Sequence, residues 1–213
     1  MKQMNVKITR CYNFEMRATK EEEKGIVEGR AIIYDRETDL GYFTEVIAPG
    51  ALKNTDLKDV RFLVNHNTDM IPLARSRNNN ENSTMQLIVD EKGLKIRVKL
   101  DIENNTEARN LYSAIQRGDI TGMSFMFTIR GESWEEEDSD HPLRRITDIE
   151  RVFEVSAVTF PAYEDTEINA RCKLELENFK STLESARRNQ TPDGGVEDIE
   201  LLKLKTKIKL GLK

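Results

Sequence analysis

Residues 151–161 read RVFEVSAVTFP, and this stretch decides the fold. Its valine, phenylalanine and threonine residues favour an extended strand, and the proline that closes it interrupts strand pairing. We therefore expect residues 151–160 to form a strand. Side chains alternate between the two faces of a strand, so Glu154 should share a face with four other residues of the stretch. These four are Val152, Ser156, Val158 and Phe160.

Other runs of strand length precede this stretch. They cover residues 5–17, 25–34, 42–47, 60–66, 85–89, 94–100 and 122–130. Residues 90–93 (DEKG) are turn-like with a closing glycine, so the runs on either side of them predict a β-hairpin. The alternation is clearest in LKIRVKL, residues 94–100.

One helix is predicted in the main body of the chain. Between residues 105 and 117 the apolar side chains Ala108, Leu111, Tyr112 and Ile115 recur at helical spacing, and Gly118 follows as a stop signal. About eight strands with few helices predict an α+β, mainly β body with a barrel-like arrangement.

The texture of the sequence changes near residue 171. Residues 172–188 have a polar helical pattern, and residues 189–195 (NQTPDGG) have the composition of a linker. Residues 201–213 contain five lysines and no acidic residue. We predict a main domain over residues 1–171 and an appendage over residues 172–213, whose basic end is either a solubilising terminus or a weak contact for DNA.

Composition excludes several classes of function. The formal net charge is -5, so no overall basic field favours a nucleic acid partner. Cys11 and Cys172 lie far apart without CxxC spacing, which argues against a disulfide framework and against a thiolate zinc site. No apolar run approaches the roughly 18 residues that span a bilayer, and residues 1–10 do not resemble a signal peptide. We expect a soluble chain that is not exported and needs no cofactor or metal.

The histidines limit any imidazole base to two positions. His66 ends the apolar run VRFLVNH, and His141 lies in the charged segment EEEDSDHPLRR. For a lone histidine, an ordinary hydrogen-bonded residue at a strand end is the favoured interpretation of His66. Neither histidine belongs to an HExxH or comparable metal-ligand motif, and the acidic run 135–138 is typical of a solvated loop.

Two further residues are candidates for chemistry. Ser124, in GDITGMSFMF, follows a glycine-containing turn and enters an apolar strand, although serine is common at turns and the hydrolase elbow motif is absent. Glu154 needs a partner because its strand is apolar. That partner is either Arg144 or Arg145 in a salt bridge, or an imidazole N–H whose tautomer the carboxylate would fix.

Several blocks in order resemble the prohead proteases of tailed bacteriophages, serine peptidases of capsid maturation related in fold to herpesvirus assemblin. The resemblance covers roughly residues 25–170. Ala74 departs from it, because the family more often has glycine there. The matching blocks are GIVEGRAIIYD, YFTEVIAPGAL, VRFLVNH, IPLARS, GLKIRVKLD, IQRGDITGMSFMF and RVFEVSAVTFPAYEDTEI.

The resemblance implies an assemblin-like closed β-barrel and assigns roles to individual residues. His66 would be the general base, Ser124 the nucleophile and Glu154 the acid that orients the imidazole. Assemblin-like enzymes use a second histidine in the third role, so His141 stays an alternative. The oxyanion hole would consist of backbone N–H groups, with Arg75 as a candidate helper.

The implied function is a serine endopeptidase inside the assembling prohead, in the host cytoplasm. Its expected substrates are the scaffold, the major capsid protein and its own C-terminal appendage; contact with the portal protein and an oligomeric state are left open. Two alternatives remain, a catalytically inactive scaffolding or shell-interior binding protein with a protease-like fold and, less favoured, a small-molecule esterase.

Overall fold

The computed structural model describes residues 7–12, 16–18, 25–136, 139–159 and 176–185. The chain divides into two compact units, residues 1–172 and residues 173–213. Within the second unit, residues 176–185 form a helix, inside the range for which the sequence predicts one. The linker-like segment 189–195 and the basic end 201–213 lie outside the described residues.

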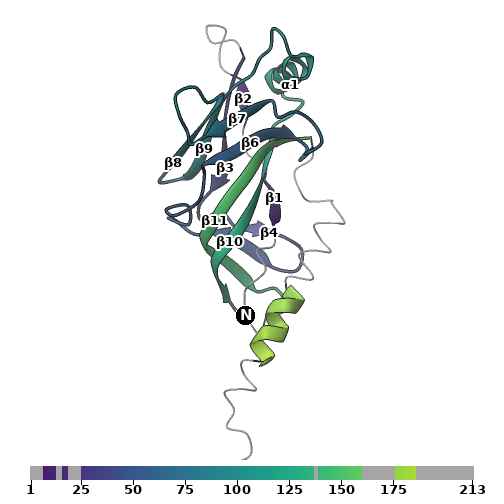
Figure 1. The fold of residues 1–213 in the computed structure, drawn as a ribbon. Coiled ribbons are helices and arrows are strands. Elements are labelled where there is room, and N and C mark those ends of the chain that lie inside the picture. The colour runs from purple at the N-terminus through teal and green to yellow at the C-terminus, as the bar shows by residue number, and fades with distance from the viewer. Residues whose placement is uncertain (1–6, 13–15, 19–24, 137–138, 160–175, 186–213) are drawn as a thin grey trace, which may run out of the picture. The chain divides into compact units, whose positions relative to one another are not determined.

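The larger sheet contains seven strands (Figure 1). They are β1 (Ile8–Tyr12), β4 (Thr38–Asp39), β5 (Thr44–Ile47), β6 (Asp59–Val64), β7 (Ala74–Arg77), β10 (Gly122–Glu135) and β11 (Leu143–Val158). The long strands β10 and β11 form its central pair. Strand β1 pairs with β10, and both β5 and β6 pair with β11, while β4 extends the sheet beyond β5 and β7 extends it beyond β6.

The smaller sheet contains four strands in the order β2-β3-β9-β8. They are β2 (Arg17–Ala18), β3 (Ile26–Ile33), β8 (Met85–Asp90) and β9 (Gly93–Lys99). Strands β8 and β9 form an antiparallel hairpin in which Asp90 pairs with Gly93, which confirms the hairpin predicted from the sequence.

The fold is mainly β, as predicted, but the described strands do not close into a barrel. The larger sheet runs from β1 to β4 and the smaller one from β2 to β8, so each path ends at an open edge. The physical reason lies in β11, which pairs in parallel with β5 at its start and with β6 near its end. A long strand with different partners at its two ends makes the sheet branch, and alternation in a sequence identifies faces but not neighbouring strands.

The predicted helix is present as α1 (Thr106–Arg117). Asn105 caps its N-terminus by accepting hydrogen bonds from the backbone N–H groups of Glu107 and Ala108, and Gly118 ends it in the left-handed conformation. The four apolar residues that recur at helical spacing in the sequence are the buried ones. That spacing therefore predicted the buried side of this helix correctly.

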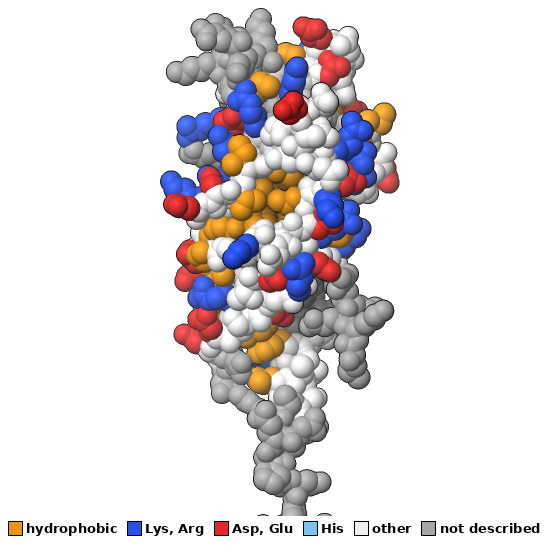
Figure 2. Space-filling view, turned by 60° about the vertical axis from the view of Figure 1, so that its left-hand side comes forward, with side chains coloured by type: hydrophobic (Ala, Val, Ile, Leu, Met, Phe, Trp, Pro, Cys, Tyr) orange, Lys and Arg blue, Asp and Glu red, His pale blue; other side chains and the backbone are white. Residues whose placement is uncertain are grey.

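Apolar side chains from both sheets and from α1 form one core. Phe62 from β6 and Phe125 and Phe127 from β10 are fully buried in it. On the face drawn in Figure 2, acidic and basic side chains are interspersed around a central hydrophobic area. Among the described residues, no helix has the length and apolar character needed to cross a membrane.

Candidate functional site

The antiparallel pairing of β10 with β11 brings two of the predicted site residues to one face of the larger sheet. Ser124 lies directly opposite Ser156, and Met126 lies directly opposite Glu154. Residues two apart along a strand point to the same side, and the intervening Phe125 points into the core. The candidate nucleophile and the candidate acid therefore share a face that is not the core face.

A β-bulge in β11 separates Glu154 from the core. Met126 pairs with Glu154, and the next residue of β10 already pairs with Val152, which leaves Phe153 as the extra residue. The bulge reverses the alternation, so Glu154 and Val152 point to opposite sides. The prediction that they share a face is therefore wrong, whereas the predicted shared face with Ser156 is confirmed by a hydrogen bond between the two side chains.

His66 follows β6 in an unusual backbone conformation. Asn65 and His66 both have positive φ, 49° and 56°. Asn65 is held by hydrogen bonds from its backbone N–H to the carbonyl of Ala157 and from the backbone N–H of Thr159 to its side-chain oxygen. Two successive left-handed residues turn the chain sharply at the strand end, and the hydrogen bonds of Asn65 to the end of β11 stabilise that turn.

The turn brings the imidazole of His66 onto the carboxylate of Glu154. Nδ1 of His66 lies 2.6 Å from Oε1 of Glu154. Ser156 Oγ donates to the other carboxylate oxygen at 2.6 Å and accepts from the backbone N–H of His66 at 3.2 Å. Because a carboxylate only accepts, Nδ1 carries the proton in this contact, and in a neutral imidazole Nε2 is then the basic nitrogen.

The arginine alternatives for Glu154 are engaged elsewhere. Arg144 contacts Glu45 at 3.2 Å and Glu132, and Arg145 contacts Glu135 at 2.6 Å. The sequence left either an arginine or an imidazole as the partner of Glu154. In the structure the partner is the imidazole of His66. The side chain of Glu154 is 4% exposed, so water screens this contact little.

Ser124 is fully buried and holds its hydroxyl in a specific orientation. Its Oγ donates a hydrogen bond of 2.8 Å to the backbone carbonyl of Arg10 in β1. Directly opposite residues in an antiparallel pair have Cβ atoms about 4.5–5.5 Å apart, so Ser124 is a neighbour of Ser156, which binds the His66 backbone. A hydroxyl has one proton, and in this orientation that proton points to the Arg10 carbonyl, while the oxygen can still accept a hydrogen bond.

His141 lies in a different part of the molecule. Its Nε2 contacts Thr44 Oγ1 at 3.1 Å and Asp39 Oδ1 at 3.4 Å, near the beginning of β11. Glu154 lies far along the same strand, and a rise of about 3.3 Å per residue separates the two regions by roughly 35 Å. His141 is therefore not part of the cluster formed by His66, Glu154 and Ser156.

Arg75 and Ala74 lie in β7, beside β6. Arg75 binds both carboxylate oxygens of Asp59, at 2.6 and 2.9 Å, and this lowers the pKa of the Asp59 carboxyl below its usual value. Arg75 thus stabilises the strand that ends just before the turn to His66, and within the described residues its side chain pairs with Asp59 and not with Glu154. Ala74 is a buried strand residue opposite Phe62.

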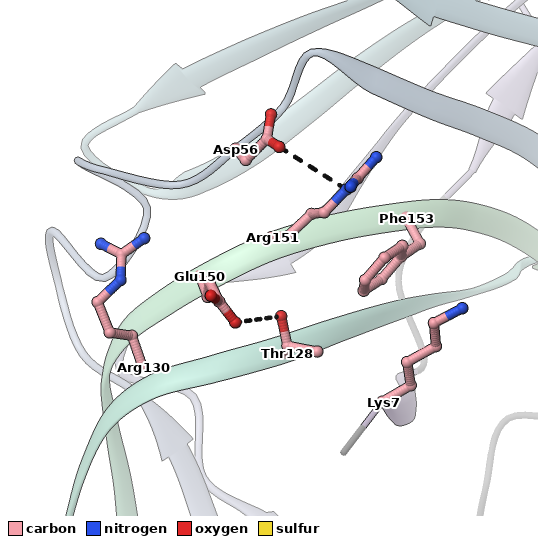
Figure 3. Close-up of a pocket in the computed structure, with 7 residues that line it drawn as sticks. All are labelled: Lys7, Asp56, Thr128, Arg130, Glu150, Arg151 and Phe153. Carbon is pink, nitrogen blue, oxygen red and sulfur yellow. Dashed lines mark hydrogen bonds and ion pairs between the residues drawn. The ribbon is translucent and has the colours of Figure 1, made fainter. Parts of the chain in front are cut away.

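Two cavities lie along the same face of the sheet. One, of about 310 Å³, is lined by Glu154 and Met126 and by residues of β6 and of the segment that follows His66. The other, of about 390 Å³, is drawn in Figure 3 and is lined by residues of β10 and β11, including Thr128 and Arg151. Lys7 and Phe153 line both cavities.

Sequence reasoning missed Ser156 and Asn65. The spacing of Glu154 and Ser156 on one strand face was a usable signal, because a buried carboxylate needs hydrogen-bond donors. Asparagine next to the candidate histidine was a second signal, since asparagine tolerates the left-handed conformation better than most residues.

Comparison with known proteins gives one match. A family model described as caudovirus prohead serine protease matches residues 12–182, more than three quarters of the chain. No curated protein and no solved structure gives a significant match. The matched range contains His66, Ser124 and Glu154. The chain therefore belongs to the caudovirus prohead serine protease family.

Proposed function

We propose that this chain is the endopeptidase of prohead maturation, with Ser124 as nucleophile, His66 as general base and Glu154 as the acid that orients the imidazole. The single observation that carries this proposal is the 2.6 Å contact between His66 Nδ1 and Glu154 Oε1, on the sheet face that also bears Ser124. A nearly buried carboxylate bound to an imidazole beside a serine is the arrangement that acyl transfer requires.

The roles follow from the chemistry of peptide hydrolysis. A serine hydroxyl is a weak nucleophile until a base accepts its proton during attack on the scissile carbonyl. Nε2 of His66 is suited to this task, because Glu154 holds the proton on Nδ1 and stabilises the imidazolium that forms. The same imidazole then gives the proton to the leaving amine, and a water repeats the sequence to release the acyl group.

In the described conformation the proton of the proposed nucleophile is donated to the main chain. The Ser124 hydroxyl donates to the Arg10 carbonyl, and the side chain is fully buried. Attack therefore requires that this hydrogen bond be exchanged for one to the imidazole of His66 and that a substrate carbonyl reach the buried hydroxyl. The hydrogen bond to be exchanged has a net worth of about 1 kcal/mol, so its loss is a small part of the barrier.

The substrates we propose are regions of the scaffold and of the major capsid protein, cut inside the prohead in the host cytoplasm, together with the enzyme's own C-terminal appendage. The two compact units of the chain, which divide near residue 172, support a separable appendage. Before its removal, this appendage would direct the enzyme to the interior of the shell. A variant truncated after residue 171 that still enters proheads as efficiently as the full chain would contradict this targeting role of residues 172–213.

One observation favours the alternative of an inactive scaffolding or shell-interior binding protein. Ser124 is fully buried with its proton donated to the main chain, as a purely structural serine would be. The two functions differ in reactivity: a peptidase must be labelled at Ser124 by a fluorophosphonate probe once it is active, and a scaffold must not.

The decisive experiment is co-expression of the full chain with its capsid protein, followed by mass spectrometry of all new termini. The wild type should generate new termini in the capsid protein and in itself, and Ser124→Ala should generate none. Identical termini in the two samples would exclude Ser124 as the nucleophile. Fluorophosphonate labelling of the same samples distinguishes a peptidase that has not met its substrate from a protein without activity.

A further inference from the structure

Two cationic side chains lie close to Met126 and Glu154, the residue pair that follows Ser124 on this face of the sheet. Arg61 lies on β6 beside Glu154, and Lys7 precedes β1, two residues before Thr9, which pairs with Met126. Both line the cavity of about 310 Å³ beside the catalytic candidates. Met126 lies two residues from Ser124 along β10, a distance of roughly 7 Å.

Two positively charged side chains lie close to the ring of Phe153. Lys7 Nζ lies 4.6 Å from the ring centroid, and the guanidinium carbon of Arg151 lies 4.9 Å from it. Figure 3 shows Lys7 and Arg151 at the ring of Phe153, with Asp56 on the far side of Arg151. Two like charges at one ring repel each other, and an anion between them would offset that repulsion.

Glu154 and Asp59, the acidic groups beside Arg61, already have other partners. Oε1 of Glu154 contacts His66, and Oε2 accepts from Ser156. Asp59 binds Arg75 with both oxygens, and Arg61 reaches it at 3.2 Å. In the lining of this cavity Lys7 and Arg61 outnumber the one carboxylate, Glu154. The chain as a whole carries a net charge of -5, so this excess of positive charge is local.

The rest of this cavity is apolar. Met70, Pro72 and Met126 contribute to its lining. A volume of about 310 Å³ is at the lower end of the roughly 300–1,000 Å³ typical of ligand pockets, which suits one side chain of a polypeptide better than a whole cofactor. A side chain with an apolar stem and an anionic end matches both parts of the lining.

We propose that this cavity is a specificity subsite for an acidic side chain, best glutamate, of the substrate polypeptide. The inference rests on the proposed peptidase function and names its substrate class. An extended chain rises about 3.3 Å per residue, so the acidic residue lies within about three residues of the scissile bond. Lys7 and Arg61 bind the carboxylate, and the methylene groups contact the apolar lining.

The test uses full-length protein and synthetic peptides that span a cleavage site mapped by the co-expression experiment. At each of the three positions on either side of the cut, glutamate, glutamine and lysine are compared by kcat/KM. At one position we expect glutamate to exceed glutamine by about tenfold, as a charge-assisted hydrogen bond would give, and lysine to be slowest. Added salt should reduce this preference.

Charge reversal provides the second arm. In the double variant Lys7→Glu with Arg61→Glu, the preference at that position should invert, so that the lysine peptide becomes the fastest. The exposed Lys92, in the β8–β9 turn of the other sheet, supplies the control: Lys92→Glu makes the same change of charge and should keep the preference for glutamate.

The outcomes separate the two levels of the proposal. A wild type that labels at Ser124 and cleaves, but treats glutamate and glutamine alike at all positions, overturns the subsite and leaves the peptidase standing. A wild type that neither labels nor cleaves overturns the peptidase itself. Lys7→Glu alone, at an exposed residue, replaces the double variant if the latter fails to fold, and an unchanged preference in it overturns the role of Lys7.

Discussion

Ser156 donates its hydroxyl proton to Oε2 of Glu154 at 2.6 Å and, through the same oxygen, accepts the backbone N–H of His66 at 3.2 Å. One buried hydroxyl thereby fixes both the carboxylate and the backbone of the residue that the carboxylate orients. Ser156 is a positioning residue in the proposed mechanism, because it acts on the reacting groups only through these two partners.

Ser156→Ala should slow labelling of Ser124 and lower the free energy of unfolding. The variant leaves a buried carboxylate oxygen and a backbone N–H without their partner, which costs about 1–3 kcal/mol. Urea unfolding and fluorophosphonate labelling rates measure the two effects. Ser156→Thr restores the hydroxyl and should recover most of the labelling rate, which a purely structural role of the side-chain volume would not explain.

Ser76 offers a matched control for this prediction. It is equally buried, and within the described part of the chain its hydroxyl has no hydrogen-bond partner. Removal of an unsatisfied buried hydroxyl should leave stability unchanged or raise it, so Ser76→Ala should behave like the wild type or better. Equal losses in the two variants would contradict the role assigned to Ser156.

Glu154→Gln should abolish most of the activity with little change in stability. A glutamine amide can donate to Nδ1, which favours the imidazole tautomer that carries its proton on Nε2 and cannot act as base. Loss of an orienting carboxylate lowers kcat by roughly 10⁴-fold in a comparable triad. Peptide cleavage measures the loss, and Glu91→Gln, in an exposed turn, is the control. Retention of more than a tenth of the activity would remove Glu154 from the mechanism.

The sequence predicted the parts of the fold that depend on local pattern. The hairpin of β8 and β9 and the helix α1 were both correct, because alternation, helical spacing and turn residues are local signals. The strands β10 and β11 are longer than predicted, because their outer halves are highly charged. Arg144, in this part of β11, is nevertheless buried, since Glu45 and Glu132 neutralise its charge there.

The features that the sequence could not predict depend on which strands become neighbours. The hydrogen bond from Ser124 to Arg10 requires β1 beside β10, and the open sheets require the branch at β11. No glycine or proline in residues 151–156 indicates the β-bulge at Phe153. The contact between His66 and Glu154 was one of the predicted alternatives, and the pairing of β6 with β11 brings these two residues together.

The left-handed turn at Asn65 should be needed more for activity than for folding. Asn65→Val places a β-branched residue at positive φ and removes the bonds to Thr159, so unfolding should become easier by about 1–3 kcal/mol. Displacement of the adjacent His66 should also slow labelling of Ser124 at least tenfold, as expected for a misplaced base.

Asn79 provides the matched control for the left-handed turn. It also has positive φ, 51°, and its side chain bonds the backbone of Leu87. Asn79→Val should therefore lose similar stability and keep the labelling rate of the wild type. If both variants label at the same reduced rate, the effect is one of general stability and the turn at Asn65 has no special role.

The ion pair between Arg30 and Asp90 should make stability depend on acid pH. Arg30 binds both oxygens of Asp90, which lowers the pKa of this carboxyl from 3.8 to about 2. Because the folded-state pKa is depressed, the native state binds fewer protons, and the stabilisation is complete above pH 3.8 and lost as the pH falls toward 2. Urea unfolding should show Asp90→Asn less stable than the wild type at neutral pH, with the gap closing in that acid range. A gap that is constant with pH would show that ionisation of Asp90 does not contribute.

Gly93, where β9 begins, should not tolerate a side chain, although Gly50 should. A Cβ at Gly93 would lie 2.0 Å from the backbone carbonyl oxygen of Ile32, so the pairing of β3 with β9 would have to shift. Gly50 also has positive φ, but a Cβ there would meet no atom within 4 Å, so Gly50→Ala costs only the left-handed strain of about 1–2 kcal/mol. We expect Gly93→Ala to cost about 3 kcal/mol or more in urea unfolding, because backbone atoms must move. Equal losses in the two variants would mean that φ alone, and not the contact with Ile32, makes glycine necessary at this hairpin.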